Sequence, residues 1–170
     1  MAVLDNVKAA RSSLTSSGVL SGRVSTVNLA LLSNGVAGGR TIEYKRGLPG
    51  NSDTDKKEFL ADVSSFANTA GGDLLFRMDE NQGLPTQIVG LQVGDIDLEI
   101  RRLESIAAGL SPRVRYAMRA VTTAGGQKTL VVRVERSWSG PHRVVFQGSD
   151  KFYDLDCQHA YDVWLQLRNL

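Results

Sequence analysis

The sequence has a single cysteine, Cys157, so the chain cannot form a disulfide within itself. A lone cysteine fits a reducing compartment, and we expect a cytoplasmic protein. The sequence also lacks an uninterrupted apolar run of about 18 residues, so we expect neither a membrane-spanning helix nor a membrane partner. The N-terminal stretch MAVLDNVKAARSSL carries Asp5 and no apolar centre, so we expect no secretory signal peptide.

The sequence also lacks a complete phosphate-binding loop. GGQKT at residues 125–129 resembles one, but Gln127 separates the glycines from Lys128, and the earlier glycine of the motif is missing. FANTAGGD at 66–73 has two glycines, which follow an expected helix instead of preceding one. Because the carbonyl end of a helix repels phosphate, we expect this segment to turn the chain from a helix into a strand.

The composition is that of an ordinary globular protein, with 42% hydrophobic and 22% charged residues in 170 positions. We expect residues 1–38 to form an N-terminal arm or extension and residues 39–170 to form one domain. The net charge is +2, but nine Lys or Arg residues between Arg101 and Arg143 accompany two acids, Glu104 and Glu135. This segment is either a solvated basic face or a binding surface for nucleic acid or another polyanion.

The spacing of apolar residues predicts two main helices. The first lies within residues 55–72 and ends at Gly71 or Gly72, either of which suits a left-handed C-cap. The second runs from Asp95 to Gly109 and is capped by Asp95. A further apolar pattern over residues 160–167 predicts a C-terminal helix. The expected core stripe of the first helix contains Phe59, Leu60, Val63, Phe66 and Ala67.

Alternating patterns predict strands at residues 41–45, 73–78 and 86–91, and a β-hairpin with arms at 114–121 and 129–136. Successive side chains of a strand point to opposite faces. The hairpin is therefore expected to have one apolar face and one arginine-rich face. The arginines of that second face are Arg113, Arg115, Arg119 and Arg133.

Two groups of residues have side chains that bind metals in other proteins. The segment DLDCQH at 154–159 contains Asp, Cys and His, but its spacing matches no known zinc finger, so we interpret it as a surface turn. Glu43 and Asp79 each lie on or just beyond an expected strand. Paired carboxylates can hold a divalent cation for phosphodiester cleavage, although two solvated surface acids would give the same pattern.

Three stretches, IEYKRGLP (42–49), KKEFLADVSSFANTAGGDLLFRMDE (56–80) and GLPTQIVGL (83–91), together resemble the Schlafen AlbA-like domain family, also described as divergent AAA or DNA-binding domains. The family pattern is a Glu-aromatic-Lys strand, a helix ending in A-N-x-x-G-G, an apolar strand ending in acids, and a turn into I-x-G-L. GLSPR at 109–113 and the strand VVRVERS resemble the family's second half, so the resemblance covers about Gly39 to Tyr153.

The resemblance implies an α+β fold with a mixed, mainly antiparallel sheet and two main helices, to which the sequence adds the C-terminal helix. It also implies nucleic-acid binding or a regulatory role close to it. Some Schlafen proteins are RNases with three carboxylates, and two of those positions match Glu43 and Asp79 (or Glu80). The third falls at Gly38 or Gly39, which argues against RNase activity because a metal site weakens when it loses a ligand.

We therefore expect a domain that binds DNA or RNA, without catalysis, a metal or another cofactor. One alternative is a metal-dependent RNase that uses Glu43, Asp79 and Glu80 with Mg²⁺ or Mn²⁺. The other is a protein-interaction or self-assembly module, which would form a homo-oligomer or bind a larger protein partner. The residues expected to contact nucleic acid are Lys45, Arg46, Arg113, Arg115, Arg119 and Arg133.

Overall fold

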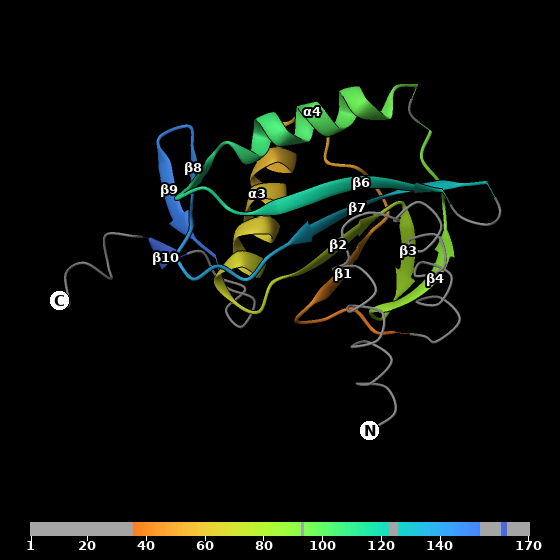
Figure 1. The fold of residues 1–170 in the computed structure, drawn as a ribbon, viewed down its shortest axis with the longest axis horizontal. Coiled ribbons are helices and arrows are strands. Elements are labelled where there is room, and N and C mark those ends of the chain that lie inside the picture. The colour runs from red at the N-terminus through yellow and green to blue at the C-terminus, as the bar shows by residue number, and fades with distance from the viewer. Residues whose placement is uncertain (1–35, 93, 123–125, 154–160, 163–170) are drawn as a thin grey trace.

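The computed structural model describes residues 36–92, 94–122, 126–153 and 161–162. Two helices, α3 (Asp53–Asn68) and α4 (Ile96–Ala107), lie on the same side of a four-stranded sheet (Figure 1). α4 begins at the predicted cap, Asp95, whereas α3 begins at Asp53, before the expected residue 55, and is capped by Ser52; both caps accept hydrogen bonds from backbone N–H groups of the first turn. Neither helix is long and apolar enough to cross a membrane.

The four-stranded sheet is mixed and mainly antiparallel, in agreement with the fold class predicted from the sequence. Its strand order is β1-β2-β7-β6. β1 and β2 are parallel because α3 connects them and returns the chain to the same end of the sheet, whereas β2–β7 and β6–β7 are antiparallel. The strands are β1 (Ile42–Lys45), β2 (Gly72–Phe76), β6 (Tyr116–Thr122) and β7 (Lys128–Val134).

The strand expected over residues 73–78 is interrupted, and that detail of the prediction was wrong. Arg77 has a φ of 67°, which ends β2 and directs the chain into a separate hairpin. This hairpin consists of β3 (Met78–Asn81) and β4 (Leu84–Ile88). Its turn is Gln82-Gly83, both with positive φ, as a tight two-residue connection requires.

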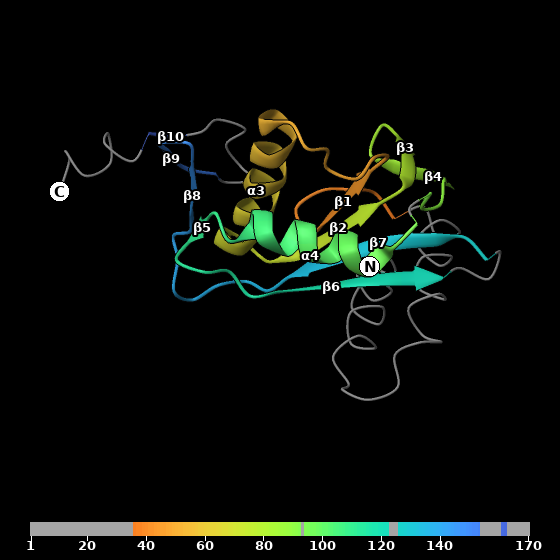
Figure 2. The same ribbon diagram turned by 90° about the horizontal axis from the view of Figure 1, so that it is seen from above.

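A second sheet lies beside α3 and has the strand order β10-β9-β8-β5. Figure 2 shows β8 and β9 next to α3, with α4 crossing over the main sheet. The C-terminal helix expected over residues 160–167 lies outside the described residues, except for Tyr161–Asp162, which form a short strand. The strands are β5 (Leu110–Ser111), β8 (Arg143–Phe146), β9 (Ser149–Phe152) and β10 (Tyr161–Asp162).

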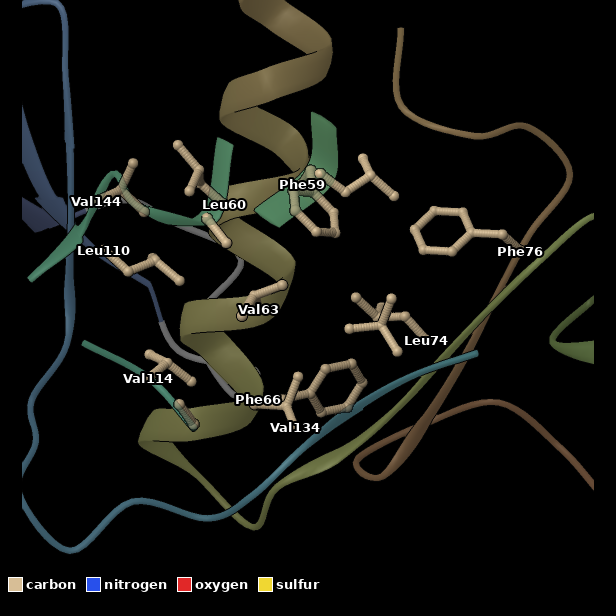
Figure 3. Packing of buried hydrophobic residues seen from close by; sticks show 14 of the residues in the cluster. Phe59, Leu60, Val63, Phe66, Leu74, Phe76, Leu110, Val114, Val134 and Val144 are labelled. Atoms are coloured by element: carbon tan, nitrogen blue, oxygen red, sulfur yellow. The ribbon is translucent and has the colours of Figure 1, made fainter. Parts of the chain in front are cut away.

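The larger hydrophobic core lies between the helices and the main sheet. All five apolar residues expected on the stripe of α3 are buried there, and the largest contributions come from residues such as Phe59 and Phe66. Figure 3 shows Phe59 and Phe66 on the side of α3 that faces β2 and β7, and Leu60 on the side of Leu110 and Val144. A smaller cluster lies on the opposite face of the sheet and contains Val36, Ile42, Tyr44, Leu75, Met78 and Ile88.

Candidate nucleic-acid interface

The β6–β7 hairpin has the two faces that the sequence predicts. Leu130 and Val132 of β7 belong to the larger core, whereas Val131 between them packs against the smaller cluster on the other face. Residues paired across neighbouring strands share a face. Arg119 is paired with Val131 and therefore lies on the face away from the helices, as does Arg133, which is paired with Ala117.

The arginines of this face have different partners. The guanidinium of Arg133 donates two hydrogen bonds to the carboxylate of Asp73 on β2, both of 2.8 Å, and this pair is largely shielded from solvent. Two parallel N–H···O bonds are the strongest geometry available to an arginine and a carboxylate. The charge of Arg133 is thus already compensated within the protein. By contrast, the side chains of Arg113, Arg115 and Arg119 are exposed.

A hollow of about 730 Å³ lies at the start of β6, next to the C-terminal end of α4. Arg113, Arg115 and Arg133 line this hollow together with Glu104 and Glu135, so its charges are mixed, with one positive charge in excess. Tyr116 also lines it, and burial, reinforced by the charge of Glu104, raises the pKa of its phenol. A ligand in this hollow would meet arginine donors on the strand side and carboxylates beside them.

Lys45 lies in a cluster of acids, here called the lysine cluster. Its Nζ atom is 2.8 Å from Glu43, 2.9 Å from Glu58 and 3.0 Å from Asp62. Burial alone would lower the pKa of Lys45, but the three carboxylates outweigh that effect and raise it, so the ammonium keeps its charge. Burial and the charge of Glu43 raise the pKa of Asp62 to about 7, although Lys45 acts in the opposite direction. The lysine cluster therefore carries excess negative charge, which disfavours a phosphate at Lys45.

The carboxylates expected at a nuclease site have separate partners. Glu43 belongs to the lysine cluster, Asp79 forms an ion pair of 3.2 Å with Arg46, and Glu80 accepts a hydrogen bond of 2.5 Å from the backbone N–H of Gly83. In the part of the chain that the structure describes, no group of three or more His, Cys, Asp or Glu side chains is arranged to hold a metal ion. The segment at 154–159 lies outside the described residues.

Gly38, at the position of the missing carboxylate, contacts the turn of the β3–β4 hairpin. Its backbone N–H donates a 2.6 Å hydrogen bond to the carbonyl of Gly83, and a Cβ atom at Gly38 would lie 3.3 Å from that oxygen. A carboxylate side chain here would require the turn to move by a few tenths of an ångström. At Gly39, the other position where the missing carboxylate could fall, a Cβ atom would meet no atom within 4 Å. The third carboxylate is therefore missing because both positions are glycines, and crowding opposes a side chain only at Gly38.

The sequence analysis missed an exposed aromatic residue close to the arginines. Trp138 is 86% exposed, and the guanidinium carbon of Arg136 lies 4.4 Å from the centre of its ring, which is cation–π geometry. Both residues belong to residues 135–141, here called the tryptophan loop. Its sequence ERSWSGP offered a signal, because a tryptophan flanked by serines, glycine and proline has few apolar neighbours with which to be buried.

The C-terminal end of α3 holds the tryptophan loop in place. The carbonyl of Ala67 accepts a 3.0 Å hydrogen bond from the backbone N–H of Ser137. The side chain of Asn68 accepts from the backbone N–H of His142 at 2.7 Å and donates to the carbonyls of His142 and Tyr153 at 2.9 and 3.0 Å. The segment FANTAGG thus satisfies the free carbonyls of a helix end and fixes the chain that follows β7.

Gly71 fits tightly between α3 and the tryptophan loop. Its φ is 71°, its backbone N–H donates a 2.7 Å hydrogen bond to Phe66, and a Cβ atom would lie 2.6 Å from the backbone nitrogen of Arg136. The left-handed residue expected at the end of the helix is therefore Gly71. No other residue type combines this conformation with so close an approach of the neighbouring backbone.

The sequence profile of the family described as Schlafen, AlbA_2 matches residues 39–159, and the chain belongs to this family. No curated protein matches the chain.

The chain is similar to several solved structures, among them the following two. One is the N-terminal domain of the "putative ATP-dependent DNA helicase RecG-related protein" from Nitrosomonas europaea, with 27% identity, a TM-score of 0.53, and coverage of 78% of this chain and 90% of that one. The other is the DIP2311 protein from Corynebacterium diphtheriae, with 19% identity and a TM-score of 0.47, which covers 82% of this chain. This chain spans 26% of the length of the DIP2311 protein.

Proposed function

We propose that this domain binds nucleic acid by contacting the phosphate backbone with Arg113, Arg115 and Arg119. The observation that carries the proposal is the arrangement of these three side chains, which are exposed around the first strand of the hairpin. Membership of the Schlafen, AlbA_2 family and the similarity to the N-terminal domain of the protein named as related to the DNA helicase RecG support a role connected with nucleic acid.

In this proposal, the other basic residues expected at the interface form ion pairs within the protein. Arg133 joins β7 to β2 through its ion pair with Asp73, which compensates its charge. Lys45 compensates part of the negative charge of Glu43, Glu58 and Asp62. Arg46, whose side chain is 77% exposed, contacts phosphate only if it leaves Asp79. Contacts of this kind position a strand without reading its sequence, so we propose binding with little sequence preference.

The test removes three charges from the interface and compares the result with the same loss elsewhere. The triple variant Arg113→Ala, Arg115→Ala, Arg119→Ala removes the proposed contacts. The matched control, Lys56→Ala, Lys57→Ala, Arg101→Ala, removes three cations from the helices on the other face of the sheet. Fluorescence anisotropy with labelled DNA and RNA, at several salt concentrations, gives the affinity and its salt dependence.

Each phosphate contact contributes about 0.7 to 0.9 to the slope of log affinity against log salt concentration. The interface variant is therefore expected to bind more weakly, with a slope shallower by about 2 to 3. The control is expected to keep most of the slope, because its charges act only at a distance. Equal losses in the two variants, or unchanged binding in the interface variant, would refute the proposal.

A further inference from the structure

We propose that Arg136 and Trp138 form a stacking platform for an unpaired base, so that single-stranded nucleic acid is the preferred ligand of this domain. The inference rests on the proposed function and adds the class of nucleic acid to it. The proposed arginines account for phosphate contacts, which single strands and duplexes share. The tryptophan loop adds the indole ring of Trp138, on which only a base outside a duplex can stack.

The first support is the state of the indole ring. The guanidinium of Arg136 covers one face at 4.4 Å, and the side chain as a whole is 86% exposed, so the opposite face is open to solvent. A large aromatic surface held in water is unfavourable in the free protein. A nucleobase stacked on the open face would remove that surface from water, and the neighbouring guanidinium would add favourable charge for the strand that carries the base.

The second support is that the platform is held in position before any ligand binds. The carbonyl of Ala67 anchors Ser137, directly between the two platform residues. Within the loop, the Ser137 hydroxyl accepts a 3.2 Å hydrogen bond from the backbone N–H of Ser139. Asn68 holds His142 just beyond the loop. A platform fixed on both sides loses little conformational entropy when a base stacks on it.

The third support is the position of the platform relative to the arginines. The backbone N–H of Glu135 donates a 3.0 Å hydrogen bond to the carbonyl of Arg115. Arg136 is the next residue after Glu135, so its backbone lies close to Arg115. The platform and Arg115 therefore lie at the same end of the hairpin. A basic track beside an aromatic ring is the combination that binds single strands, with phosphates on the cations and a base on the ring. Bases inside a duplex are stacked on each other and cannot reach such a ring.

The test compares single-stranded and duplex probes of the same length and sequence. Trp138→Ala removes the ring, Trp138→Phe keeps a smaller one, and Leu98→Ala removes another exposed apolar side chain, on α4, as the matched control. Circular dichroism and thermal melting establish that each variant folds. Anisotropy gives the affinity for each probe, and quenching of tryptophan fluorescence in the wild type and in Trp138→Phe reports stacking directly.

We expect Trp138→Ala to weaken single-strand binding about 5- to 150-fold, as measured for the loss of one base–aromatic stack. Duplex binding and the salt slope should stay unchanged, because no charge is removed. Trp138→Phe should retain part of the affinity, and Leu98→Ala all of it. Ligand-induced quenching should be smaller in Trp138→Phe than in the wild type.

The outcomes distinguish this inference from the proposed function. If the arginine variant weakens binding while Trp138→Ala does not, the platform is refuted and phosphate binding stands. If Trp138→Ala weakens single-strand and duplex binding equally, the preference for an unpaired base is refuted. If the wild-type protein binds neither probe at low salt, both proposals are refuted. The exposure of Trp138 would then be explained by contact with a protein partner.

Discussion

Replacement of Asn68 by alanine should destabilise the whole domain, because this side chain joins α3 to two distant segments. It makes three hydrogen bonds, all to backbone groups and all between 2.7 and 3.0 Å. Alanine keeps the helix but leaves the N–H and carbonyl of His142 and the carbonyl of Tyr153 without these partners. Aspartate would still accept from the N–H of His142 but could not donate to either carbonyl.

The expected magnitude follows from the number of bonds. A hydrogen bond contributes about 0.5 to 1.5 kcal/mol net, so the loss of three predicts a decrease of about 1.5 to 4.5 kcal/mol in the free energy of unfolding. With a urea m-value of about 2 kcal/mol per molar, the midpoint of unfolding should fall by about 1 to 2 M. This is a large part of the stability of a typical domain.

Urea titration followed by circular dichroism measures both the midpoint and the m-value. Asn81→Ala, an exposed asparagine on β3, is the matched control and should change the free energy of unfolding by less than about 0.5 kcal/mol. Asn68→Asp should recover little of the loss. The reasoning fails if Asn68→Ala is as stable as Asn81→Ala, since the three bonds would then contribute nothing net.

Two further predictions concern backbone geometry and pH. Gly71→Ala should lower the free energy of unfolding more than Gly148→Ala does. Both glycines have a positive φ, but of the two only Gly71 would bring an added Cβ atom against neighbouring backbone. Urea titration of both variants measures the difference. The pKa of Asp62 rises from 3.8 to about 7 on folding, so its stabilising contribution is full below pH 3.8 and is lost as the pH rises through 7. Asp62→Asn should therefore gain stability relative to the wild type as the pH rises from 3.8 to about 7, as urea titration at several pH values would measure; a constant difference would contradict the assignment.

Local patterns predicted the two main helices and the hairpin correctly. The apolar stripe of α3, the cap Asp95, and the alternation along β6 and β7 depend on neighbours in the sequence, and all of them are found in the structure. The break at Arg77 was not predicted. Its positive φ arises where the chain leaves the sheet to form a second hairpin, and an arginine carries no local signal for that conformation.

The partners of the basic residues could not be predicted from the same patterns. Arg119 and Arg133 occupy equivalent positions in the alternation, yet Arg133 is bonded to Asp73, 60 residues away in the sequence, and Arg119 is exposed. Likewise, the sequence predicts that Lys45 contacts phosphate, but in the structure Glu58 and Asp62 of α3 lie beside its ammonium group. Charge counting identifies a candidate surface, but tertiary pairing decides which charges on it remain available.

The bonds of Asn68 also constrain the order in which the domain can be completed during synthesis. They connect positions separated by 74 and 85 residues, so α3 leaves the ribosome long before His142 and Tyr153 are made. Until then the side chain of Asn68 and the carbonyl of Ala67 have water in place of their later partners. The turn that ends α3 can form early, because the carbonyl of Phe66 is bonded by the nearby N–H groups of Thr69 and Gly71. The contacts of Asn68 close much longer loops, which slows folding.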